Sequence, residues 1–256
     1  MTVIPILKED TPESRTAALA DSVCGLITRA VHNLTEVSEA TTEWFRRDSL
    51  DVEMIYHTGG DSIIFSASRR PTVPPVLPVI IGQVVHGCRQ VFDYIEKNKR
   101  VTLAAFPNPW PPAPDPLHSL IQDLDNALKH DRLPVVCGAM LKGLIEFRDA
   151  SGTLIGSRDA DTTRLPHRIE SGGRIFDLVA TLRDVPLSWL AEGNSIDAQF
   201  NPVLVFDEAL HRRDGREIKV LGTPLTHLDV IDVLGEMLKY TTRIANPFYE
   251  YLGLAE

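Results

Sequence analysis

The residues in this sequence whose types and spacing could support chemistry lie in the segment "IIGQVVHGCRQVFDYI", residues 80–95. His86, Arg89 and Asp93 recur there at intervals of three and four residues, and Gly82 precedes them at the same interval. On a helix these four positions lie within about 60° of one another, and the apolar residues of the segment are centred about 130° away. A histidine can take or give a proton near neutral pH, and an arginine is a permanent cation. The segment therefore predicts a polar helix face that could bind an anion or a nucleotide.

A second polar group lies in "LDNALKHDR", residues 124–132. Asn126, Lys129 and His130 are spaced by three and four residues, so they share the side of a helix that faces away from its leucines. We expect this side to face the first segment across two neighbouring helices. The predicted candidate site comprises His86, Arg89, Asp93, Asn126, Lys129 and His130, with Gly82 allowing close helix packing.

The same residues also fit a structural interpretation. Arg89 can pair with Asp93 four residues later, and Lys129 and His130 can offset the dipole of a last helical turn. If that pair is buried, Arg89→Ala should cost about 3 to 5 kcal/mol of stability. His86 and Asp93 are two turns apart, about 10 Å along the axis, which is too far for them to share a metal ion. We therefore predict no metal and no cofactor.

Four helices are expected to position these residues. Thr11 followed by Pro12 predicts the start of a long first helix that runs to about residues 46–48. Residues 80–95 form the second helix, with Pro78 near its first turn.

The other two helices are also marked by their ends. Asp115 and Pro116 predict the start of the third helix, which runs to about Lys129 or His130. Thr226 and Asp229 predict the start of the last helix, and we expect the pair Asn246-Pro247 to end it.

Strands are predicted in two places. Residues 51–68 alternate around a Gly-Gly turn, as a hairpin does, and residues 138–220 form short β-rich runs with a turn at Asp214-Gly215. We expect a single α+β domain over residues 1–256, in which a bundle of the four helices packs on an antiparallel β-sheet. Its helical parts are residues 11–130 and 226–252, and its β-rich insertion spans about 135–222.

Composition excludes several classes of protein. The chain has 256 residues, 43% hydrophobic and 24% charged, as in ordinary soluble globular proteins. No apolar run approaches the roughly 20 residues that span a membrane, and the start "MTVIPILKEDTPES" lacks the pattern of a signal peptide, so we expect a cytoplasmic protein. The formal charge of -9 argues against an extended nucleic-acid-binding face. Cys24, Cys88 and Cys137 are expected to be buried free thiols.

The two polar segments together resemble a family of bacterial proteins of unknown activity. In that family the helix reads roughly "GDxxHNLRSALDHL" and a downstream segment reads "NIDKHR". The residues of this chain that match are Gly82, His86, Arg89, Asp93, Asn126, Lys129 and His130. The likeness extends over most of the chain, including the closing "IANPFYEYL" at 244–252. The family helix is in turn similar to that of the HEPN superfamily of helical, metal-independent ribonucleases, in which four residues separate an arginine from a histidine.

This chain departs from that pattern. Tyr94 stands where the histidine would follow Arg89, Gln83 replaces the family's acid, and Gly87 replaces its asparagine. A tyrosine is a poor general base at neutral pH, so these departures argue against HEPN-type catalysis.

Two hypotheses about function follow. The first is a noncatalytic binding or interaction protein, whose polar inter-helix network is architectural or binds a small anionic ligand or a partner. The alternative is a HEPN-like ribonuclease or toxin-type protein that acts on RNA through Arg89, His86 and His130. We also predict a homodimer, because HEPN-like proteins pair through helical faces and the first helix has more apolar positions than one neighbour needs.

Overall fold

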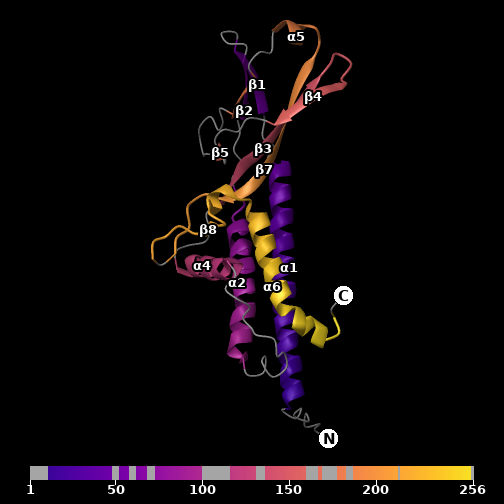
Figure 1. Cartoon of the computed structure of the whole chain (residues 1–256). Coiled ribbons are helices and arrows are strands. Elements are labelled where there is room, and N and C mark those ends of the chain that lie inside the picture. Colours follow the sequence, from indigo (N-terminus) through magenta and orange to yellow (C-terminus); the bar gives the residue numbers. More distant parts are fainter. Residues whose placement is uncertain are drawn as a thin grey trace.

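Three long helices form a bundle in the computed structural model, and the strands gather beyond one end of it (Figure 1). These helices are α1 (Pro12–Arg47), α2 (Val76–Lys97) and α6 (Val230–Tyr251), and each contacts the other two. A shorter helix, α4 (Pro116–His130), lies beside α2. The structure describes residues 11–47, 52–57, 62–67, 73–99, 116–130, 136–159, 167–168, 178–182, 187–212 and 214–254.

Helix α1 begins as its sequence predicts. The backbone N–H of Ser14 donates to Thr11 Oγ1 at 3.1 Å, and the backbone N–H of Thr11 donates to Ser14 Oγ at 3.0 Å. This reciprocal capping satisfies a free backbone donor of the first turn. The buried apolar residues of α1 pack against α2 and α6 of the same chain, whereas Val31 of this helix is 45% exposed.

Helix α2 buries the face that the sequence assigned to the core. All its predicted core residues are buried: Ile80, Ile81, Val84, Val85, Cys88, Val91, Phe92 and Ile95. Close helix packing was expected at Gly82, and this prediction is wrong. A Cβ at Gly82 would meet no atom of the described residues within 4 Å, whereas a Cβ at Gly87 would lie 3.3 Å from the Cβ of Ala30 in α1. Gly87, on the side toward α1, is therefore the glycine that allows the close approach.

Helix α6 follows a short 3-10 helix, Leu225–His227. Asp229 caps the N-terminus of α6, because the backbone N–H of Ile231 donates to Asp229 Oδ1 at 2.9 Å. The prediction that Asn246-Pro247 ends this helix is wrong, since α6 continues through Pro247 to Tyr251. Phe248 is 1% exposed, and burial of this ring offsets the backbone hydrogen bond that a proline removes.

The strands form two antiparallel sheets and a small hairpin. In the first sheet β1 (Val52–His57) pairs with β2 (Ser62–Ala67), which confirms the predicted hairpin, and β2 also pairs with β6 (Leu178–Leu182). In the second sheet β3 (Val136–Arg148) pairs along its length with β7 (Ser195–Phe206). The remaining partners of β3 are β4 (Leu154–Asp159) and β5 (His167–Arg168). The last elements are α5 (Leu187–Ala191) and the hairpin of β8 (Lys219–Val220) and β9 (Thr223–Pro224).

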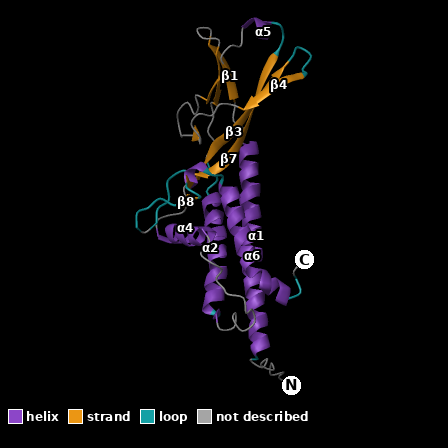
Figure 2. Cartoon of the chain, viewed as in Figure 1, coloured by secondary structure: helices purple, strands orange, loops and turns teal. Residues whose placement is uncertain are grey.

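The α+β class with a helical bundle is confirmed (Figure 2). Strand β7 contacts α6, so the second sheet extends from the end of the bundle. The predicted turn at Asp214-Gly215 is also present, with Gly215 at a φ of 80° and its N–H donating to the carbonyl of Arg212. No helix in the described part of the chain is long and apolar enough to cross a membrane.

Candidate functional site

The polar contact between α2 and α4 is centred on Asp125. Its Oδ1 lies 3.0 Å from Nδ1 of His86 in α2, and its Oδ2 accepts a hydrogen bond from Lys129 Nζ at 2.5 Å. The side chain of Asp125 is only 4% exposed, whereas those of His86 and Lys129 are about half exposed. A carboxylate removed from water is stable only when its oxygens have partners, and each oxygen here has one.

The structure brings His86 and Lys129 together through Asp125, a residue that the predicted site did not include. Ile121 and Leu128 place Asp125 on the apolar face of α4, because it is four residues after the first and three before the second. An acid on an apolar helix face was the sequence signal for this residue. The side chain of His130 lies outside the described residues.

Arg89 and Asp93 form the ion pair that the structural interpretation predicts. The distance from Arg89 Nη2 to Asp93 Oδ1 is 2.7 Å. The Arg89 side chain is 20% exposed and that of Asp93 is 48% exposed, so the carboxylate of this pair remains hydrated. The pair belongs to α2 alone and lies one turn beyond His86.

A second acid ties α4 to a different neighbour. Asp123 Oδ2 lies 2.9 Å from Arg212 Nε in the hairpin before β8. Both atoms are buried, and neither has a hydrogen-bond partner with good geometry in the described part of the chain, so the contact is an ion pair. Burial raises the pKa of Asp123, and the Arg212 charge partly opposes that rise. Helix α4 is thus held on two sides by its own carboxylates.

Among the described side chains of this site, His86 is the one whose geometry suits proton transfer. If its Nδ1 carries the proton, that N–H donates to Asp125 and leaves the Nε2 lone pair available. A carboxylate that orients an imidazole in this way is a recurring part of general-base sites.

The cysteines and the possible metal ligands of the described residues are further candidates for chemistry. Burial raises the pKa of Cys88 to about 11, so this thiol stays protonated at neutral pH and is a poor nucleophile. Cys24 and Cys88 are buried and free, as predicted, and the side chain of Cys137 lies outside the described residues. Among the residues that the structure describes, no three His, Cys, Asp or Glu side chains are grouped to hold a metal ion.

Comparison of the chain with protein-family models, with curated proteins and with solved structures finds no match.

Proposed function

We propose that this chain is a noncatalytic binding or interaction protein, in which the polar residues of α2 and α4 hold the bundle together. One observation carries this proposal: four residues of the predicted site are each in a hydrogen bond or an ion pair within α2 and α4, namely His86, Arg89, Asp93 and Lys129. Asp125 is shared between His86 and Lys129, and Arg89 is paired with Asp93. A cation already neutralised by a carboxylate 2.7 Å away is a poor receptor for a substrate phosphate.

The residue five positions after Arg89, Tyr94, supports the same proposal. Tyr94 stands where a HEPN-like ribonuclease would have its histidine, and it points into a groove between α1 and α2 that is separate from the α2–α4 contact. A catalytic arginine and a base would need to share one cleft. Arg89 is not among the residues that line the groove of Tyr94, and its guanidinium is already paired with Asp93.

The half-exposed ring of His86 favours a second candidate function. Its orientation by a buried carboxylate is compatible with a general base, so a HEPN-like ribonuclease or toxin-type protein using His86, Arg89 and His130 is the alternative. The lining of the site would then be expected to bind RNA phosphates.

Incubation of the purified chain with a mixed-sequence single-stranded RNA tests the two candidates. We expect no cleavage by the wild type above that of a matched His86→Ala preparation, because His86 and its neighbours serve the fold. The His86→Ala chain is the control for contaminating nucleases. Cleavage by the wild type that disappears in His86→Ala, with an unchanged melting temperature, would contradict the proposal and support the ribonuclease.

A cytoplasmic homodimer is the further prediction from the sequence. Helix α1 packs against α2 and α6 of the same chain, so its buried apolar face is already occupied within the monomer. Light scattering at micromolar concentration should give twice the 28.4 kDa mass of the chain if the dimer forms. A monomer mass at that concentration would contradict it.

A further inference from the structure

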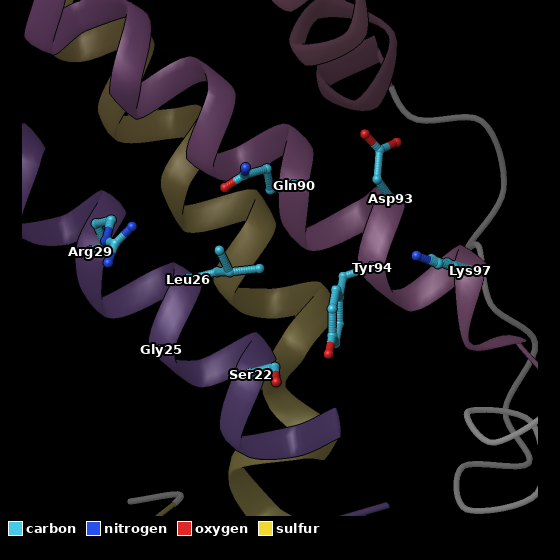
Figure 3. Close-up of a pocket in the computed structure, with 8 residues that line it drawn as sticks. All are labelled: Ser22, Gly25, Leu26, Arg29, Gln90, Asp93, Tyr94 and Lys97. Carbon is cyan, nitrogen blue, oxygen red and sulfur yellow. The ribbon is translucent and has the colours of Figure 1, made fainter. Parts of the chain in front are cut away.

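Helices α1 and α2 flank a groove (Figure 3). Its volume is about 580 Å³, within the range of small-molecule sites. The residues that line it are Ser22, Gly25, Leu26 and Arg29 of α1, and Gln90, Asp93, Tyr94 and Lys97 of α2.

The floor of the groove is apolar and open. Leu26 and the ring of Tyr94 project toward it from the two helices (Figure 3). Beside Leu26 on α1, Gly25 leaves free space, because a Cβ there would meet no atom of the described residues within 4 Å. Tyr94 is 38% exposed, so its ring is only partly covered within the described part of the chain. An apolar ligand body could remove this surface from water.

The charges around the floor are mainly positive. Arg29 and Lys97 are exposed cations, and neither forms an ion pair with another described residue. The acid of the lining, Asp93, already neutralises Arg89. In Figure 3 the Lys97 side chain extends toward Tyr94, and Arg29 lies at the opposite side of the groove. On a chain with a formal charge of -9, two cations beside an apolar floor that have no acidic partner among the described residues favour an anionic ligand.

We propose that this groove binds a small amphipathic organic anion, with its hydrocarbon body on Leu26, Gly25 and Tyr94 and its anionic head beside Lys97. The proposal rests on the proposed binding function, to which it gives a location and a ligand class. It does not depend on the contact of His86 and Lys129 with Asp125, because none of these three residues lines the groove.

The test uses 8-anilinonaphthalene-1-sulfonate as the probe and decanoate as its competitor, with fluorescence as the measurement. The wild type should bind the probe and release it to decanoate, and decanol and decylamine at equal concentration should displace much less. Equal displacement by decanol would overturn the anionic head, and a wild type that binds no probe would overturn the site.

Two substitutions localise the binding. Gly25→Leu fills the groove and should weaken binding by at least about tenfold, and Lys97→Gln should weaken it by about two- to fivefold. Gly235→Leu on α6 is the matched control, because a Cβ there also meets no described atom within 4 Å and the position is outside the groove. Leucine is a better helix former than glycine, so neither leucine variant should melt below the wild type.

The outcomes separate this inference from the proposed function. Unchanged binding in Gly25→Leu, or equal loss in Gly235→Leu, would overturn the groove whatever the RNA assay shows. RNA cleavage that depends on His86, with probe binding still lost in Gly25→Leu, would overturn the noncatalytic function and leave the groove in place.

Discussion

Asp125 is the one residue with an ionisable acidic or basic side chain that is buried among those that the structure describes as buried and polar. Its side chain is 4% exposed on the apolar face of α4, and it is stabilised there by His86 and Lys129. Arg89 pairs with Asp93, as the four-residue spacing predicts, because both lie on one helix and local spacing is visible in sequence. The contact of His86 with Asp125 spans 39 residues, so its partner could not be read from the sequence of either helix alone.

Arg89→Ala should cost about 1 kcal/mol of stability, less than the value expected from the sequence for a buried pair. The reason is that Asp93 is 48% exposed, so water solvates its carboxylate when the guanidinium is removed. Thermal melts of the wild type and Arg89→Ala would measure this, with Arg89→Lys as the control for loss of side-chain packing. A loss above about 3 kcal/mol would show that Asp93 becomes buried without its partner.

At the scale of elements, the helix starts follow from local chemistry. Thr11, Ser14 and Asp229 cap α1 and α6 as their residue types predict, because a cap depends on neighbours within three residues. The end of α6, which lies beyond Pro247, could not be predicted from neighbouring residues in the same way. The sequence near it is that of a helix end, but burial of Phe248 in the tertiary structure extends α6 by another turn. Close packing at Gly87 was missed for a similar reason, since Ala30 is distant in sequence.

The cap of α6 gives a prediction at this scale. Asp229→Ala should destabilise the chain by about 1 kcal/mol, whereas Asp229→Asn should cost little, because asparagine accepts the same hydrogen bond from Ile231. Urea unfolding of both variants measures the difference. Equal losses would show that the side-chain cap contributes nothing.

The pH dependence of the same cap follows from its burial. Burial raises the pKa of Asp229, so the folded chain holds this proton more tightly than the unfolded chain. The carboxyl therefore lowers stability as the pH rises from its ordinary pKa through the raised value, and the cost remains at higher pH. Asp229→Asn should gain relative to the wild type over that interval, and the opposite trend would contradict the burial.

At the scale of the whole molecule, the fold class and the local hairpin could be predicted, but the pairing of strands distant in sequence could not. Alternating residues predicted the hairpin of β1 and β2, and long apolar repeats predicted the helices. The pairing of β2 with β6 and of β3 with β7 joins segments far apart in the chain. Such pairing depends on which edges meet in three dimensions, and no local pattern encodes it.

The attachment of α4 is also a property of the whole molecule. Asp125 holds it to α2, and Asp123 holds it to the hairpin that precedes α6. The packing of α4 against both α2 and the hairpin of Arg212 therefore depends on two carboxylates of α4. If these contacts are architectural, their loss should lower the free energy of global unfolding.

The most direct measurement is the urea unfolding free energy of the double variant His86→Ala/Lys129→Ala. It leaves the buried Asp125 carboxylate without either partner, so we expect a loss of about 3 to 5 kcal/mol. The single variants should lose less, because one partner remains in each. Adding Asp125→Asn to the double variant should recover part of the loss, since the unpaired charge is removed. A double variant within about 1 kcal/mol of the wild type would contradict an architectural role for the α2–α4 contact.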